Sequence, residues 1–233
     1  MSIAENLNEV RSRIAEACRR VGRSPQEVQL IAVSKTKPIE MIREAFQAGQ
    51  KSFGENYVQE AVEKVNQFPE ADWHFIGSLQ TNKVKQVVGR FSLIHSADRL
   101  KLIDVIAKAA SAAGLVQDIL LEINVGGEET KHGASFEEAP ALIDHILSLP
   151  SLRLRGLMAL PPLTDDEKIA RANFGRLREA LEKWRCERMS GEAASHFTEL
   201  SMGTSSDYEW AILEGATMVR VGTSIFGARE YVR

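Results

Sequence analysis

Short runs of apolar and β-branched residues recur along the chain, and a segment with helical periodicity follows each of them. The runs occupy residues 28–34, 51–54, 73–77, 91–95, 118–125, 152–160, 197–201 and 217–221. Several are continuously apolar rather than alternating, which is typical of parallel strands covered on both faces. The pattern therefore predicts eight strands in regular alternation with helices.

Eight strand–helix units in a chain of 233 residues indicate a closed (β/α)₈ barrel, the TIM-barrel fold. An open, doubly wound sheet is the alternative, because the rules for connecting parallel strands allow both topologies. A further helix is expected from Ile3 to Val21, before the first strand. No linker rich in proline, glycine or serine interrupts the sequence, so we expect residues 1–233 to form a single domain.

Residues typical of helix ends support the predicted helices. Pro38 suits a first helical turn and Gly49 suits a helix C-terminus. Asp98 is a candidate cap for a helix that ends before Gly114. The Ser/Thr-x-x-Glu spacing of a capping box occurs at 135–138, 164–167 and 206–209, and Gly215 would close the last of these helices.

Composition and charge narrow the possible functions. The formal net charge is −3, so charge offers no argument for binding nucleic acid or an anionic membrane. No apolar run approaches the ~20 residues that span a bilayer, and residues 1–21 lack the apolar stretch of a signal peptide. Cys18 and Cys186 are far apart and have no metal-site spacing. We expect a cytoplasmic protein with free thiols.

Polar residues follow the predicted strands at the end of a barrel where catalytic and binding groups lie. They include Asn56, Ser96 and Asn124, but the most informative is Lys35, which follows the run LIAVS. Partial desolvation at a barrel mouth disfavours the ammonium form and makes the amine a better nucleophile toward carbonyls. The alternative is a lysine that only extends its head into solvent.

Two similar loops follow the last two predicted strands, SMGTS at 201–205 and RVGTS at 220–224. Glycine lets the backbone approach an anion closely, and N–H groups at a helix start then point at it. Such clusters also occur as ordinary turns, but barrels frequently bind phosphate at this pair of loops. A lysine and a phosphate site together fit either a Schiff-base aldolase acting on a phosphorylated sugar or a pyridoxal 5′-phosphate (PLP) protein.

A resemblance to a known family separates these two possibilities. The matching stretches are AVSKTKP at 32–38, FGENYVQE at 53–60, HFIGSLQTNK at 74–83, LEINV at 121–125, GLMALP at 156–161, LSMG at 200–203 and RVGTSIFG at 220–227. With these motifs, nearly the whole chain resembles the pyridoxal phosphate homeostasis proteins. These are small fold-type III PLP barrels related to the N-terminal domain of bacterial alanine racemases.

The resemblance implies roles for individual residues. Lys35 would hold PLP as a Schiff base. Ser201 and Gly203 match the first phosphate-loop motif of the family, and Gly222 and Thr223 match the second.

The remaining implied site residues surround the cofactor ring. Arg220 would face the pyridine nitrogen and discourage its protonation, while Asn56 and Met158 would line the pocket. His74 and residues 80–83 look like a pocket rim, although His74 also suits a buried place inside the barrel.

The chain departs from the family in one loop. Methionine, serine and two aspartates are expected after SMG, but Thr204, Ser205, Ser206, Asp207 and Tyr208 stand there. One acid is therefore missing from the start of the next helix. Tyr208 and Trp210 are unusual in that helix.

The resemblance implies a PLP carrier or buffer without efficient catalysis, which would pass PLP to PLP-dependent apo-enzymes. Racemisation needs acid/base groups on both faces of the substrate Cα, and the racemases take one from a second domain that we do not expect here. A racemase-like or aldolase-like enzyme and an interaction protein are the alternatives. His74 is the expected pocket imidazole, whereas His95 beside Ser96 can point outward. We expect a monomer.

Overall fold

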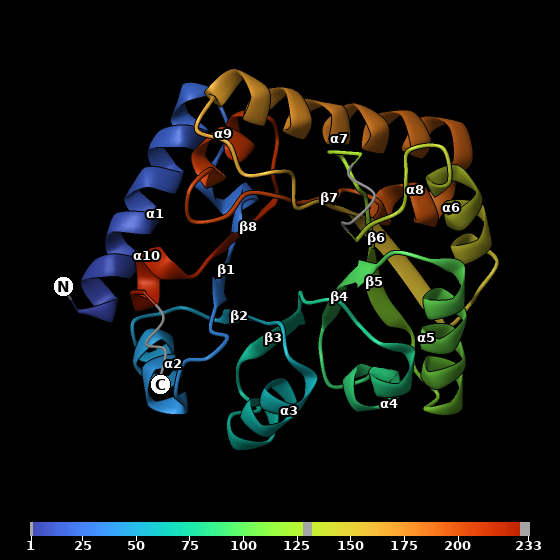
Figure 1. Cartoon of the computed structure of the whole chain (residues 1–233), viewed down its shortest axis with the longest axis horizontal. Helices are drawn as coiled ribbons and strands as arrows, with labels where there is room; N and C mark the ends of the chain where they lie inside the picture. Colours follow the sequence, from blue (N-terminus) through green and yellow to red (C-terminus); the bar gives the residue numbers. More distant parts are fainter. Residues whose placement is uncertain (1, 128–131, 229–233) are drawn as a thin grey trace.

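The strands of the chain form one closed parallel barrel. The computed structural model describes residues 2–127 and 132–228, and in it each strand pairs with the next while the eighth returns to the first (Figure 1). The closed barrel is confirmed and the open sheet is excluded, because β8 pairs with β1. Each predicted run contains or overlaps one strand. The strands are β1 (Gln29–Val33), β2 (Ser52–Glu55), β3 (Asp72–Phe75), β4 (Leu93–Ala97), β5 (Gln117–Glu122), β6 (Leu152–Met158), β7 (Glu199–Ser201) and β8 (Met218–Val221).

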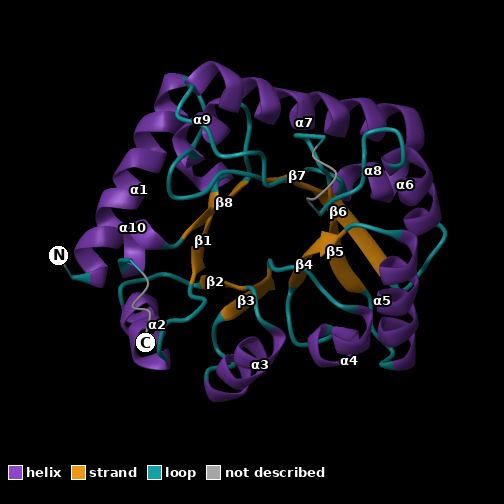
Figure 2. Ribbon diagram, viewed as in Figure 1, coloured by secondary structure: helices purple, strands orange, loops and turns teal. Residues whose placement is uncertain are grey.

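Helices surround the barrel on its outside, as Figure 2 shows. The expected helix before the first strand is present as α1, which buries Leu7, Val10 and Ile14 at helical spacing and packs against α2, α9 and α10. The helices are α1 (Ile3–Arg20), α2 (Ile39–Gln47), α3 (Val58–Gln67), α4 (Val84–Val87), α5 (Leu100–Ala112), α6 (Ala139–Leu147), α7 (Glu167–Arg188), α8 (Gly191–His196), α9 (Tyr208–Leu213) and α10 (Thr223–Phe226), with short 3₁₀ turns at Pro25–Glu27 and Thr81–Lys83.

The apolar core has two parts. The larger part fills the space between the strands and the surrounding helices. The smaller part is a separate cluster of buried residues from β1, β4, β5, β6 and β8, in keeping with the side-chain layers that fill TIM barrels. This second cluster contains Ile31, Leu93, Leu120, Met158 and Met218.

The helix-end predictions are partly confirmed. Gly49 and Gly215 follow α2 and α9 with positive φ values of 85° and 95°. Pro38 is the N-cap of α2, one residue before its first turn. Ser135 and Glu138 exchange the two hydrogen bonds of a capping box at 3.0 and 3.1 Å, just before α6 begins.

Three predicted caps are wrong, because a neighbouring residue takes the position. Arg99 rather than Asp98 is the N-cap of α5. Asp166 caps α7 by accepting from the Lys168 N–H at 2.8 Å, which displaces the predicted box at 164–167. Asp207 is the N-cap of α9, so the box at 206–209 does not form.

Three further sequence expectations concern membrane-spanning helices, the cysteine thiols and metal sites. Across the part of the chain that the structure describes, every helix is too short or too polar to span a bilayer. Cys18 is buried, Cys186 is exposed, and both are free. Within residues 2–127 and 132–228, no group of His, Cys, Asp or Glu side chains is arranged to hold a metal ion.

Candidate functional site

A cavity of about 850 Å³ lies at the carboxyl ends of the strands. We call it the mouth cavity. It brings together residues from the loops after β1, β2, β7 and β8, which are far apart in the sequence. The predicted site residues Lys35, Asn56, Gly203, Arg220, Gly222 and Thr223 all line it.

The backbone on both sides of Lys35 is fixed to helix α3. Thr36, the next residue, has a φ of 64°, an unfavourable left-handed conformation for a β-branched residue. Its N–H donates to Glu60 Oε1 at 2.6 Å. On the other side, Lys64 Nζ donates to the carbonyl oxygen of Ser34 at 2.7 Å. The half-buried Lys35 therefore projects from a short, anchored turn.

A buried ion pair supports this anchor. Lys64 Nζ lies 2.7 Å from Glu55 Oε1 and 2.5 Å from Glu60 Oε1. Glu55 is fully buried and also accepts from Ser34 Oγ at 2.7 Å. Burial raises the pKa of Glu55, while Lys64 opposes the rise. Sequence reasoning missed this network because no local motif links its members.

The two glycine loops meet at the cavity wall. Gly203 has a φ of 90°, and a Cβ there would lie 2.6 Å from Ala211 Cβ. A Cβ on Gly222 would lie 3.2 Å from the carbonyl oxygen of Val33. The Gly222 N–H donates to Ser205 Oγ at 3.1 Å, which joins one loop to the other. Both glycines therefore lie so close to a neighbouring element, α9 or β1, that a Cβ would force the wall of the cavity to shift.

Hydroxyl and N–H donors surround these glycines. Ser205, Ser206 and Thr223 line the mouth cavity, and Thr223 begins α10. The first N–H groups of a helix have no acceptor within it, so the start of α10 suits an anion. Asp207 also lines the cavity, but its Oδ1 accepts from the Thr204 N–H at 2.6 Å and the Thr204 hydroxyl at 2.9 Å. Its carboxylate is thus used to shape the loop.

Arg220 is a buried cation at the cavity floor. Its NH1 donates to Ser201 Oγ at 2.5 Å and its NH2 to the carbonyl oxygen of Ala159 at 2.9 Å. Burial lowers the pKa of Arg220 to about 10, with Glu122 opposing. The guanidinium therefore remains charged at neutral pH. Ser201 was expected to line the cavity as part of the phosphate loop. Instead it is absent from the cavity lining and contacts Arg220 from behind.

Glu122, the last residue of β5, is a site residue that sequence reasoning missed. It lines the mouth cavity and is 6% exposed. Burial raises its pKa to about 7, with Asp98 adding to the rise and Arg220 and Arg99 opposing it. An acid that ends the otherwise apolar run ILLE was a usable signal, since acids are rarely buried in such strands unless they are paired.

The two strand histidines lie inside the barrel. The rim position expected for His74 is wrong, and its alternative buried place is confirmed, because His74 is 3% exposed and bonds to Asp72 and His95. The outward orientation allowed for His95 is also wrong. Its ring is fully buried and contacts Ser201 Oγ at 2.9 Å.

Other predicted residues lie around or below the mouth cavity. Gln80 and Lys83 line a neighbouring hollow, of about 870 Å³, that shares Asn56 with the mouth cavity. Met158 is buried in the interior apolar cluster and does not line the cavity.

The unusual aromatic residues of α9 have a packing role. Tyr208 is buried, and the Arg13 guanidinium of α1 lies 5.8 Å from its ring centroid. Trp210 is partly buried against the core. Both help α9 pack against its neighbours.

Comparisons with known proteins agree with this geometry. The model of the alanine racemase N-terminal domain family matches residues 5–230. A pyridoxal phosphate homeostasis protein of Aquifex aeolicus is 46% identical over 233 residues, covering 99% of this chain and 100% of the relative. PipY of Synechococcus elongatus, solved with PLP bound, is 36% identical with a TM-score of 0.84, covering 97% of this chain and 100% of that one. An alanine racemase of Clostridium difficile, 14% identical with a TM-score of 0.77, covers 99% of this chain and 60% of that chain and shares the fold alone.

Proposed function

Because this chain belongs to the pyridoxal phosphate homeostasis protein family, we propose that it binds PLP in the mouth cavity and carries or buffers the cofactor in the cell. The observation that carries the proposal is the convergence of three chemical groups on one cavity. They are the Lys35 amine, the two glycine loops and the buried Arg220 guanidinium.

The residues present fit the chemical groups of PLP. The cofactor supplies an aldehyde that an amine can capture, and Lys35 offers that amine from its anchored turn. Gly203, Gly222 and the hydroxyl-bearing Thr223 line the same cavity and would hold the phosphate there. Asn56 Oδ1 is buried in the cavity wall without a hydrogen-bond partner among the described residues, so a bound polar group would satisfy it.

Arg220 would face the pyridine nitrogen and keep it unprotonated. A guanidinium only donates hydrogen bonds, so the nitrogen that it contacts must accept and remain unprotonated. An unprotonated ring withdraws electrons less strongly from a bound amino acid. In this role, Ser201 and Ala159 position Arg220 through their contacts with its NH1 and NH2.

A second candidate function, proton transfer on a bound amino acid, is favoured by Glu122. Its pKa of about 7 suits a general acid or base at neutral pH. We propose the carrier as the main function because Glu122 is charge-coupled to Arg220 and Asp98 rather than paired with a second base. Incubating the PLP-loaded protein with amino acids in deuterated water tests this choice by NMR. Exchange of Cα–H at enzymatic rates, lost in Glu122→Gln, would favour the enzyme.

The covalent link to Lys35 is tested by spectroscopy and mass spectrometry. The protein mixed with PLP should show a visible absorbance band, and borohydride should fix PLP on the peptide that contains Lys35. Lys35→Ala should lose the band, while Lys108→Ala, an exposed position on α5, should keep it. An adduct found only on Lys37 or Lys83 would overturn the assignment.

The phosphate role of the glycine loops is tested by comparing PLP with pyridoxal. Thr223→Val should weaken PLP binding by roughly 1–3 kcal/mol, because a charged acceptor loses a hydrogen bond. Pyridoxal, which lacks the phosphate, should bind equally to both proteins. Equal affinities of the unaltered protein for PLP and pyridoxal would argue against phosphate recognition.

The proposed recipients of the cofactor are PLP-dependent apo-enzymes. A single-domain monomer of residues 1–233 would present the mouth cavity to them, and sedimentation of the PLP-loaded protein tests the monomer. Transfer is measured by the recovery of an apo-enzyme's activity after mixing with the loaded protein. Recovery no faster than release of PLP into buffer would argue against direct transfer.

A further inference from the structure

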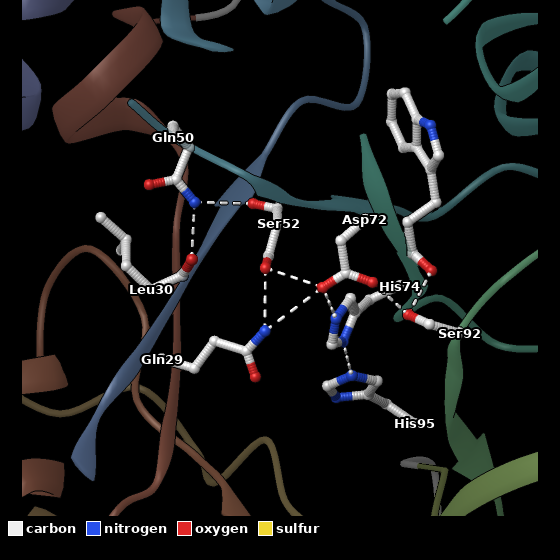
Figure 3. Close-up of polar contacts among 9 residues, drawn as sticks. Gln29, Leu30, Gln50, Ser52, Asp72, His74, Ser92 and His95 are labelled. Atoms are coloured by element: carbon white, nitrogen blue, oxygen red, sulfur yellow. Dashed lines mark hydrogen bonds and ion pairs between the residues drawn. The ribbon is translucent and has the colours of Figure 1, made fainter. Parts of the chain in front are cut away.

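A continuous chain of hydrogen bonds crosses the barrel interior from Asp72, at the start of β3, to Arg220 at the mouth cavity. His74 Nε2 lies 2.9 Å from Asp72 Oδ2, and His74 Nδ1 lies 2.9 Å from His95 Nε2 (Figure 3). His95 Nδ1 then lies 2.9 Å from Ser201 Oγ, which accepts from Arg220 NH1 at 2.5 Å. The members come from β3, β4, β7 and β8.

The Asp72 end of the chain is held as an acceptor. Asp72 Oδ2 accepts from Ser52 Oγ at 2.8 Å, and Oδ1 accepts from Ser92 Oγ at 2.5 Å, as Figure 3 shows. This end lines a hollow of about 210 Å³ at the opposite end of the barrel from the mouth cavity.

The two ends determine the direction of every hydrogen bond when both rings are neutral. A carboxylate only accepts and a guanidinium only donates. His74 must therefore carry its proton on Nε2 and accept at Nδ1, which requires a proton on His95 Nε2. His95 Nδ1 then accepts the Ser201 O–H, and the Ser201 oxygen is left to accept from Arg220.

A protonated chain would have a different order. An imidazolium at His74 would donate to both Asp72 and His95, and His95 Nδ1–H would then donate to Ser201. The full burial of His95 disfavours extra charge on this chain, and Arg220 is already a cation beside it. Burial also lowers the pKa of His95, and a positive charge on either His74 or Arg220 lowers it further, so His95 is the ring least able to hold an extra proton.

We propose that His74 and His95 are positioning residues, which hold Ser201 as an acceptor so that the Arg220 guanidinium faces the bound cofactor. The inference rests on the proposed PLP site, but the state of the two rings does not depend on any ligand. Both rings are neutral, with the proton on Nε2, before PLP binds. Arg220 is thereby oriented in advance.

The first test is ¹⁵N NMR of histidine-labelled protein without PLP. The signals of His74 and His95, assigned from single variants, should show protonated Nε2 and unprotonated Nδ1 at neutral pH. A protonated ring, or His95 with its proton on Nδ1, overturns the proposal even if PLP binds at Lys35. The expected tautomers without any PLP binding would instead count against the proposed function alone.

The second test compares two replacements of His95. Gln can accept from Ser201 and donate to His74, whereas Leu can do neither. His95→Leu should weaken PLP binding about tenfold and shift the visible absorbance maximum of the loaded protein, and His95→Gln should recover most of both. The control is His145→Leu on α6, which lies away from the cavity. Its Nε2 lies 2.7 Å from Asp104 Oδ1, and the replacement should change neither PLP affinity nor the absorbance maximum.

Ser201→Ala keeps the test decisive if His95→Leu does not fold. It removes the acceptor of Arg220 while keeping both rings, so it should reproduce the weaker binding and the shifted spectrum. Unchanged affinity and spectrum in Ser201→Ala would show that Arg220 needs no positioning by this chain. That result would overturn the proposal.

Discussion

Replacing Glu122 with Gln should change the way in which stability depends on pH. Glu122 is buried at the end of β5, and burial raises its pKa from 4.5 to about 7. The folded protein therefore holds a proton at Glu122 that the unfolded chain has already lost between about pH 4.5 and 7. The contribution of Glu122 to stability must fall as pH rises through this window, because at this group the unfolded state binds fewer protons than the folded state.

The size of the effect follows from the shift. Each pKa unit corresponds to about 1.4 kcal/mol, so a rise of roughly 2.5 units costs at most about 3.5 kcal/mol of unfolding free energy above pH 7. Gln has the shape of protonated Glu and does not ionise. The stability of Glu122→Gln relative to the unaltered protein should therefore increase by about 2–3 kcal/mol between pH 5 and pH 8.

Urea unfolding at pH 5, 6, 7 and 8 measures this difference. Comparing two proteins at each pH cancels the titration of groups that do not contact Glu122. Glu182→Gln, an exposed position on α7, removes the same charge from the surface and should show little dependence on pH. A difference for Glu122→Gln that stays constant within about 0.5 kcal/mol would refute the reasoning, because Glu122 would then be ionised throughout.

Three further predictions concern the frame of the site. Lys64→Met should lower the unfolding free energy by about 3–5 kcal/mol in urea titrations, because it leaves Glu55 buried without its counter-charge. Adding Glu55→Leu should restore part of that loss, and a double variant less stable than Lys64→Met would contradict the assignment. Gly203→Ala should weaken PLP binding at least about tenfold by fluorescence titration, since the new Cβ would displace α9. Gly114 also has a positive φ, of 66°, but a Cβ there would meet no atom within 4 Å. Gly114→Ala should therefore affect stability but leave PLP affinity unchanged.

The barrel and much of the site could be predicted because they follow from periodic patterns. Continuous apolar runs indicated the parallel strands, and the carboxyl ends of parallel strands in a barrel share one rim. Residues such as Lys35, Asn56 and Arg220 therefore come together although up to 185 positions, from 35 to 220, separate them. No knowledge of side-chain packing was needed for that step.

The failures have local physical causes. His95 points inward in a strand whose pairing with β5 shifts register between Ile94 and Ala97, so simple alternation does not indicate its side. Asp166 and Asp207 cap α7 and α9 in place of nearby predicted residues, because several side chains at a helix start can accept the same N–H groups.

The contacts that hold the site were the hardest to predict. Lys64 lies nine positions from Glu55 and belongs to another element. Whether the two side chains meet depends on how α3 packs against β2. The chain from Asp72 to Arg220 depends in the same way on the closed barrel, because the contact between His95 and Ser201 joins β4 to β7 across the interior. Long-range polar pairs of this kind leave no periodic signal.

Among the residues that the structure describes, the proposed site holds its charged groups firmly and exposes part of its rim. The turn of Lys35 is tied to α3 and Arg220 is tied to Ser201 and Ala159, so neither group must move when PLP enters. On the rim, Leu163 lines the mouth cavity yet is 80% exposed. Water can therefore reach the cavity, and a covalent link formed by condensation can be reversed by hydrolysis there. A preorganised site whose described rim is open in this way gives PLP both a specific place and a way out, in keeping with the proposed carrier role.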